Sequence, residues 1–142
     1  MDKKLKVFAP LLENQAPKNG WIHSIRTAFK MSLRQFGERV GVTRQGAEGI
    51  EKREQEKSIT LKSLEEAGRA LNMQLVYGFV PMDGSIEKSI EKRAVALAKE
   101  IVKTTSHTMA LEDQENSTER LEKAVEDKAK QLIYEMPRHL WD

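Results

Sequence analysis

Two short helical patterns flank a three-residue turn in the stretch 32–52. Ser32 and Gln35 form a Ser-x-x-Gln pattern, which is typical of a capping box at the start of a helix. Gly41 can end that helix, because glycine adopts the positive φ of a helix C-terminus at little cost. Thr43 can then cap a second helix that fills the rest of the stretch. The pattern predicts two short helices that meet across a tight turn.

Further residues of this stretch meet the steric demands of two crossing helices. Gly37 is small where the helices are expected to cross, and Val42 is expected to be the buried apolar residue of the turn. Ile50 is expected to anchor the second helix, which we place from Arg44 to about Lys52. Such a helix can lie in the major groove of double-stranded DNA, with its first residues at the base edges. The stretch therefore predicts a helix-turn-helix that binds DNA.

Basic residues gather around this predicted motif. Residues 18–53 hold eight Lys or Arg and three Asp or Glu, whereas the whole chain of 142 residues has a net charge of +2. A local excess of positive charge favours binding to a polyanion, because neutralised phosphates release counterions. The same excess is also compatible with an ordinary solvated surface.

Composition excludes several other classes of protein. The chain has no cysteine, which excludes disulfides and thiolate metal sites. It has no apolar run of the ~18 residues that a transmembrane helix needs, and its first ten residues lack a signal-peptide pattern. The three histidines lie far apart, and no nucleophile or phosphate-loop motif is present. We expect a cytoplasmic protein that is not an enzyme and takes no metal or cofactor.

The pattern of elements divides the chain into four parts. We expect an N-terminal arm over 1–19, the helix-turn-helix domain over 20–74, a short strand over 75–81 and a helical region over 85–142. Inside the domain, helical spacing and a capping threonine predict two further helices, which carry Trp21, Ile22, Ile25 and Phe29, and Thr60, Leu61, Leu64, Ala67 and Leu71. The expected fold class is mainly α, with one short β-strand.

The short strand is expected at Leu-Val-Tyr-Gly-Phe-Val, residues 75–80, because the run is β-branched and aromatic and ends at Pro81. No second strand is apparent in the chain, and an unpaired strand exposes its backbone N–H and C=O groups. The simplest partner is the same strand of a second copy, paired antiparallel about a two-fold axis, which predicts a homodimer. The alternative is a buried extended connector packed on the C-terminal helices.

Two apolar stripes with helical spacing follow the strand. They consist of Ile86, Ile90, Ala94, Leu97, Ile101 and Val102, and of Leu121, Ala124, Val125, Ala129, Leu132 and Ile133. The stripes predict an α-helical hairpin, which could serve as a dimer scaffold or as a module that binds a partner protein. This half of the chain is slightly acidic, which argues against a DNA contact there.

The motif resembles the Xre/Cro-type helix-turn-helix family over about residues 20–72. The residues that carry the resemblance are 32–43, Ile50-Glu51-Lys52, 60–64 and Ala70-Leu71. The resemblance implies base-reading side chains at the start of the second helix and contacts to the DNA backbone around it, namely Thr43, Arg44, Gln45 and Glu48, and Arg34, Lys52 and Arg53. It also implies that Glu51 forms a structural ion pair, for which Arg39 is the candidate partner.

The stretch departs from that family at several positions. Leu33 stands where a polar, phosphate-contacting residue is common, and Ala47 replaces a larger apolar residue. Gly46 and Gly49 lie inside the expected reading helix, where each costs about 1 kcal/mol relative to alanine. Two interpretations follow: the glycines let the helix approach DNA closely, or the helix no longer reads bases.

A wider set of residues resembles the bacterial family called mobile mystery protein A. The set consists of 17–22, Ile25-Arg26, Met31-Ser32, the helix-turn-helix, 75–81 and 107–112. The resemblance implies a neighbouring gene for a Fic/Doc-type protein, and so a DNA-binding transcriptional regulator that serves as autorepressor or antitoxin of a toxin-antitoxin operon.

The segment from Thr108 to Glu112 fits five positions of the inhibitory helix found in many Fic inhibitors. Asp113 stands where that pattern has Gly or Asn, and such a short pattern often arises by chance. The segment could be an inhibitory element or an ordinary helix end. The alternative function is therefore a protein-binding inhibitor of a Fic-type enzyme, with weak or no DNA binding.

Overall fold

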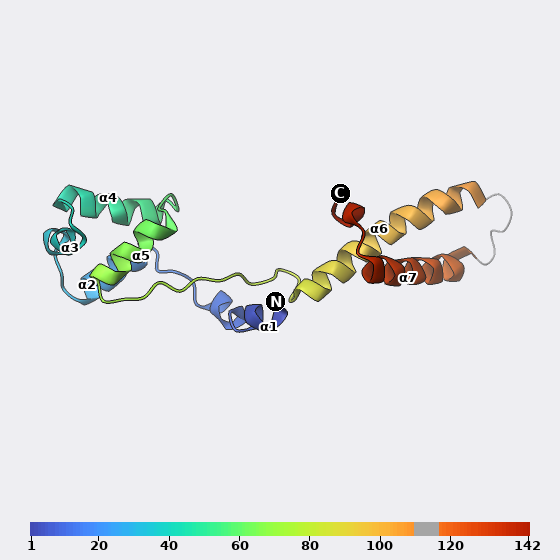
Figure 1. Cartoon of the computed structure of the whole chain (residues 1–142), viewed down its shortest axis with the longest axis horizontal. Helices are drawn as coiled ribbons and strands as arrows, with labels where there is room; N and C mark the ends of the chain where they lie inside the picture. The colour runs from blue at the N-terminus through green and yellow to red at the C-terminus, as the bar shows by residue number, and fades with distance from the viewer. Residues whose placement is uncertain (110–116) are drawn as a thin grey trace. The chain divides into compact units, whose positions relative to one another are not determined.

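The computed structural model describes residues 1–109 and 117–142, and over these residues the chain is mainly helical, as expected (Figure 1). In chain order the elements are α1 (Asp2–Lys6), the 3-10 helix η1 (Ala9–Glu13), α2 (Trp21–Ala28), α3 (Leu33–Val40), α4 (Arg44–Gln55), α5 (Leu61–Ala70), α6 (Ile86–Met109), α7 (Ser117–Glu135) and the 3-10 helix η2 (Arg138–Trp141). Within residues 1–109 and 117–142, no helix combines the length with the apolar character that a membrane span requires.

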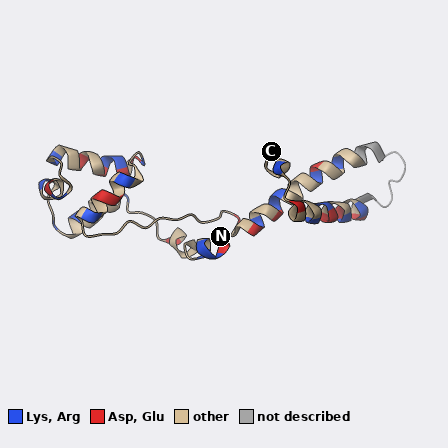
Figure 2. Cartoon of the chain, viewed as in Figure 1, with Lys and Arg blue, Asp and Glu red and all other residues tan. Residues whose placement is uncertain are grey.

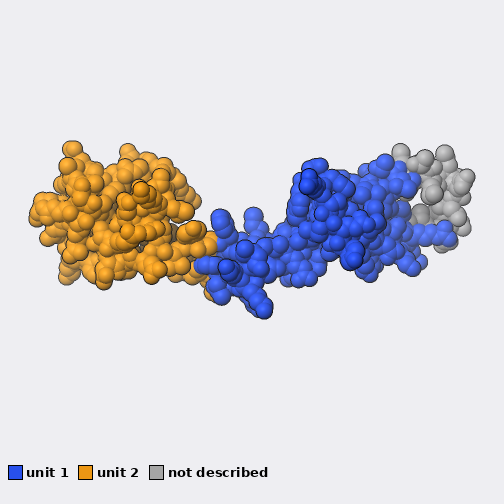
Figure 3. Space-filling model, in the orientation of Figure 1, with its two compact units in different colours: residues 1–9, 79–142 blue, residues 10–78 orange. Residues whose placement is uncertain are grey.

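The chain divides into two compact units (Figure 3). Unit 2 consists of residues 10–78 and holds α2 to α5, whereas unit 1 combines residues 1–9 with 79–142. The first nine residues thus belong to the same unit as the C-terminal helices, and the chain passes from one unit to the other inside the segment 75–81.

Unit 2 is built around one hydrophobic core. Phe36 of α3 and Leu71 after α5 are almost fully buried, and the rest of the core comes from α2, α4 and α5 with Ile22, Ala47, Ile50 and Ala67. α3 packs against α4 and α5, and α2 packs against α4. Burial of these apolar side chains supplies the main driving force for folding this unit.

The predicted helix starts of unit 2 are confirmed. The Ser32 hydroxyl accepts a hydrogen bond from the Gln35 amide at 3.0 Å, and the Gln35 side chain accepts one from the Ser32 amide at 2.8 Å. Thr43 caps α4 through the Gly46 amide at 3.0 Å, and Thr60 caps α5 in the same way. The one difference is length, since α4 continues to Gln55, past its expected end.

Unit 1 is dominated by α6 and α7, which pack side by side (Figure 1). Their shared core is small and rich in alanine, with Ala94, Ala98, Ala129, Leu132 and Leu140. Leu140 lies in η2, an element that the sequence patterns did not predict, and its carbonyl accepts a hydrogen bond from the Arg93 side chain. Lys and Arg alternate with Asp and Glu along both helices (Figure 2).

The start of α6 is capped from the N-terminal end of the chain. The Asp2 carboxylate accepts hydrogen bonds from the backbone amides of Ile86 at 2.7 Å and Glu87 at 3.3 Å. Ser85 adds a local cap, because its hydroxyl accepts from the Lys88 amide at 3.0 Å. A negative charge at a helix N-terminus also interacts favourably with the helix dipole. This contact explains why residues 1–9 belong to unit 1.

The segment 74–80 forms no strand and no backbone hydrogen bond with any other described part of the chain. Its side chains are largely solvent-exposed, with Val76, Tyr77 and Phe79 at 74%, 65% and 78%. The alternative of a buried connector is therefore wrong for these residues. Strand pairing with a second copy stays a prediction, since one chain cannot contain that contact.

Candidate nucleic-acid interface

Gly37 sets the approach of α3 to the turn. A Cβ atom added at Gly37 would lie 2.8 Å from the Val42 carbonyl oxygen and 2.9 Å from that of Thr43. The Gly37 carbonyl also accepts hydrogen bonds from the amides of Gly41 and Val42, each at 2.8 Å. Gly41 has a φ of 88°, the left-handed conformation that favours glycine. Gly41 thus has the role that the sequence predicted, whereas the close approach at Gly37 is to the turn and the cap of α4 instead of to the second helix itself.

Val42 does not have the buried position that the sequence predicted. Its residue surface is 39% exposed, and it lies at the rim of the motif instead of in the core. It covers the first turn of α4, because a Cβ atom at Gly46 would lie 2.9 Å from the Val42 Cβ. Phe36 and Ala47 belong to the core cluster, and Val42 does not.

α4 has one buried face and one exposed face. Ala47, Ile50 and Glu51 are 0%, 6% and 5% exposed, and they face the core. The exposed face carries four of the predicted DNA contacts, namely Arg44, Gln45, Glu48 and Lys52. These residues fall within about a 100° arc at 100° per residue. The structure therefore brings the predicted base-reading residues together on one solvent-facing surface, next to the exposed cap Thr43.

The two glycines of α4 differ in what surrounds them. Gly46 is required by the contact with Val42, so it serves internal packing, a role that neither sequence interpretation anticipated. An added Cβ at Gly49 would meet only the Arg53 Nη1 atom, at 3.2 Å. That atom ends a flexible side chain and can move away. Gly49 thus leaves an open stretch of surface between Gln45 and Arg53.

The basic side chains that the sequence predicts as contacts to the DNA backbone are exposed. Arg34 pairs with Glu38 at 2.7 Å, and the Lys52 ammonium lies 4.0 Å from the Glu56 carboxylate. Both pairs are more than half exposed, and exposed pairs contribute at most about 1 kcal/mol each. A phosphate can therefore replace either carboxylate at little cost. Arg53, another predicted backbone contact, is also exposed.

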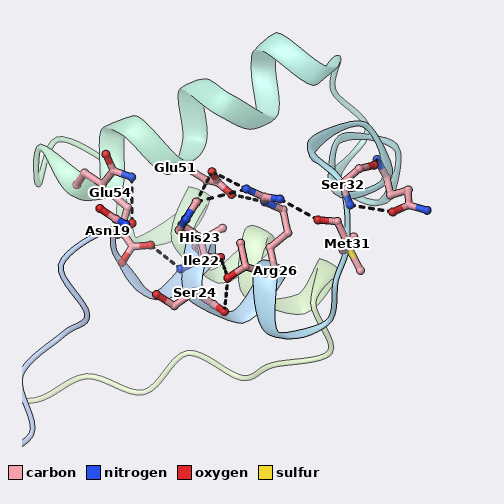
Figure 4. Close-up of polar contacts among 12 residues, drawn as sticks. Asn19, Ile22, His23, Ser24, Arg26, Met31, Ser32, Glu51 and Glu54 are labelled. Carbon is pink, nitrogen blue, oxygen red and sulfur yellow. Dashed lines mark hydrogen bonds and ion pairs between the residues drawn. The ribbon is translucent and has the colours of Figure 1, made fainter.

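Glu51 is structural, as predicted, but its predicted partner is wrong (Figure 4). The Arg26 side chain of α2 donates from Nε to one Glu51 oxygen and from Nη2 to the other, the second at 3.4 Å. His23 Nδ1 lies 3.2 Å from the same carboxylate. Arg39 instead donates to the Ala70 carbonyl at 3.4 Å, because α3 turns it toward the end of α5.

Arg26 also reaches the start of the motif. Its Nη1 donates to the Met31 carbonyl at 2.8 Å, one residue before the capping box at Ser32 (Figure 4). One buried guanidinium thus joins α2, the loop before α3 and the middle of α4. A charged group that is buried must be paired and hydrogen-bonded to be tolerated, and Arg26 meets that condition.

Sequence reasoning missed a second brace between α2 and α4. The Glu54 carboxylate accepts hydrogen bonds from the amides of Trp21 at 2.7 Å and Ile22 at 2.8 Å, and so caps α2. Gln55 donates to the Asn19 carbonyl at 3.0 Å. The available signal was Gly20, which precedes α2 and has no side chain to cap it, so that an acceptor had to come from elsewhere.

The remaining predicted site residues belong to the Fic-inhibitor pattern. Thr108 lies in the last turn of α6, and Glu112 lies outside the described residues. The arrangement of these two residues relative to each other therefore lies outside the described part of the chain.

Comparison of the chain with protein-family models, with curated proteins and with solved structures found no match.

Proposed function

We propose that this protein is a sequence-specific DNA-binding transcriptional regulator whose reading element is α4. One observation carries the proposal. The first two turns of α4 present Arg44, Gln45 and Glu48 to solvent on one face, while the adjoining face is held by the core and by buried Glu51. A short, capped helix with polar, hydrogen-bonding side chains at its exposed N-terminal end matches the geometry of major-groove reading.

Each exposed side chain has a chemical role in this proposal. Arg44 can donate two hydrogen bonds to guanine O6 and N7, and Gln45 can pair with the N6 and N7 edge of adenine. Glu48 can accept from cytosine N4. The predicted backbone contacts, Arg34, Lys52 and Arg53, would fix the register of the helix without selecting a sequence.

The braces to α2 support the same proposal. A reading helix must keep its side chains close to the productive geometry, and that requires support from residues behind it. Arg26 holds α4 at Glu51, and Glu54 holds its last turn on the start of α2. The exposed face thus belongs to a helix that α2 holds in place at two points.

The biological setting of the proposal rests on the resemblance to mobile mystery protein A. That resemblance points to a regulator that represses its own operon and acts as antitoxin toward a Fic/Doc-type protein encoded beside it. This part is tested separately by co-expressing the chain with the neighbouring gene product. Relief of growth inhibition would support an antitoxin role, and unchanged toxicity would contradict it.

DNA binding is tested by titrating the full chain into its own promoter fragment and into a scrambled fragment of equal length, at several salt concentrations. Specific binding is expected to be roughly 10³-fold or more tighter than binding to the scrambled fragment. The logarithm of the affinity should fall linearly with the logarithm of salt concentration, because phosphate contacts release counterions. Equal affinity for both fragments, or no binding at low salt, would contradict the proposal.

A further inference from the structure

Residues 76–80 form a chemical palindrome. The order Val76-Tyr77-Gly78-Phe79-Val80 is β-branched, aromatic, glycine, aromatic and β-branched, and it has the same classes in either direction. The side chains of this segment are unusually exposed for their type, since Val76, Tyr77 and Phe79 are 65–78% exposed. Contiguous exposed apolar residues of this kind mark an interaction surface.

The backbone of the segment is also free to pair. No backbone hydrogen bond joins 74–80 to another residue in the described ranges 1–109 and 117–142. Positive φ angles occur at Asn72 and Gly84, on either side of the segment, and at no residue between them. Gly78 therefore has no left-handed kink that would prevent an extended strand. The segment offers both strand-forming side chains and unused donors and acceptors.

We infer that this segment pairs with the same segment of a second copy, antiparallel, about a two-fold axis that passes through Gly78. In that register Tyr77 lies opposite Phe79 of the partner subunit, and Val76 lies opposite Val80 of the partner subunit. Aromatic pairs and β-branched pairs across neighbouring strands stabilise a sheet. The pairing also satisfies the free backbone groups of both copies.

The palindrome indicates that the strand that pairs with this segment comes from a second copy of the chain. An antiparallel pair of identical strands places each residue opposite its mirror position, so a palindrome gives each side chain a partner of its own class. Neighbouring registers place the axis at the next residue, because residues opposite each other in an antiparallel pair point to the same face of the sheet. An axis at Tyr77 sets Val76 opposite the partner's Gly78 and Leu75 opposite the partner's Phe79. An axis at Phe79 sets Tyr77 opposite the partner's Pro81, which has no amide hydrogen. Only the axis at Gly78 keeps all four matched pairs.

This inference does not rest on DNA binding, although the two fit together. A two-fold protein presents two copies of α4, as recognition of an operator with two half-sites requires. A monomer could still bind a single half-site. Failure of one proposal therefore leaves the other open to its own test.

The register is tested by disulfide trapping. The unmodified chain has no cysteine, so only the introduced thiols can form a disulfide. Opposite residues in an antiparallel pair have Cα atoms about 4.5–5.5 Å apart, within the range of a disulfide. Val76→Cys and Val80→Cys are made separately, mixed, equilibrated and oxidised. The mixture is expected to give a covalent heterodimer. Either variant alone should cross-link at least tenfold more slowly, because two copies of residue 76 are about 14 Å apart in this register.

Two outcomes would overturn the inference. One is cross-linking of Val76→Cys alone as fast as the mixture, and the other is a mixture that cross-links no faster than either variant alone. A second variant, Gly78→Pro with Phe79→Pro, removes two successive amides, and one of the two faces the partner strand in either hydrogen-bonding phase, while α2 to α7 stay helical by circular dichroism. Light scattering should give twice 16.2 kDa for the unmodified chain and about 16.2 kDa for this double variant. Equal masses for the two proteins would also overturn it.

Discussion

The Arg26 guanidinium of α2 and the Glu51 carboxylate of α4 form a buried ion pair, with side chains that are 10% and 7% exposed. The pair lies behind the exposed face of α4, so it connects the stability of unit 2 to the position of the proposed reading helix. Arg26 makes a third contact at the Met31 carbonyl, ahead of α3.

Glu51→Ala is expected to lower the free energy of unfolding of unit 2 by about 3–5 kcal/mol, because it leaves Arg26 buried without its counter-charge. Urea unfolding is followed by Trp21 fluorescence in a Trp141→Phe background, so that the signal reports unit 2. The double variant Arg26→Met with Glu51→Leu should be more stable than Glu51→Ala. A loss below about 1 kcal/mol for Glu51→Ala would mean that the pair is not a structural brace.

Gly46→Ala and Gly49→Ala are expected to change stability in opposite directions. Each gains about 1 kcal/mol in helix propensity. At Gly46 the new Cβ would lie 2.9 Å from the Val42 Cβ, and overpacking of this kind costs about 1–3 kcal/mol. At Gly49 the only neighbour is the mobile end of Arg53. Thermal unfolding should therefore show a lower midpoint for Gly46→Ala and a higher one for Gly49→Ala; the reverse order would refute the packing role of Gly46.

Glu54→Ala is expected to destabilise unit 2 by about 1 kcal/mol, because the amides of Trp21 and Ile22 lose their acceptor. Glu54→Gln keeps an acceptor oxygen without the charge and should lose less. Gly20→Ala should also destabilise, since Gly20 has a φ of 85° and its Cβ would lie 2.9 Å from the Glu54 Cδ. Denaturant titration of the three variants measures their free energies of unfolding. A free energy of unfolding for Glu54→Ala equal to that of the unmodified chain would exclude the cap.

Asp83 predicts a pH dependence in unit 1. The Ser89 hydroxyl, at 2.9 Å, and then the Lys92 ammonium, at 3.1 Å, hold the pKa of Asp83 below its ordinary value of 3.8. Because the folded pKa is the lower one, the contribution to stability is present above pH 3.8 and is lost as the pH falls through the folded value. An NMR titration should show this, with Ser89→Ala moving the pKa of Asp83 upward; a pKa unaffected by Ser89→Ala would contradict it.

Local signals predicted much of unit 2. The capping box at Ser32, the caps Thr43 and Thr60, and the turn glycine Gly41 each act within three or four residues of themselves. Such contacts depend only on residue type and short spacing, so a sequence contains the full information for them. The exposed face of α4 follows from the same helical periodicity.

Contacts between distant segments could not be predicted in this way. The choice of Arg26 over Arg39 as the partner of Glu51 depends on how α2 and α3 cross α4, and helical spacing leaves those angles open. The caps supplied by Glu54 to α2 and by Asp2 to α6 span 32 or more residues. A helix start without its own capping residue indicates only that some acceptor is needed.

The affinity of variants for the chain's own promoter fragment, at one fixed salt concentration, tests the proposed reading face most directly. Arg44→Ala and Gln45→Ala should each weaken binding by about 5- to 150-fold, which corresponds to about 1–3 kcal/mol per base contact. The matched control is Arg69→Ala on α5, where Arg69 pairs with Glu65 of the same helix, and its affinity should stay within about two-fold of the unmodified chain. Equal affinities for all three variants and the unmodified chain would contradict DNA reading by α4.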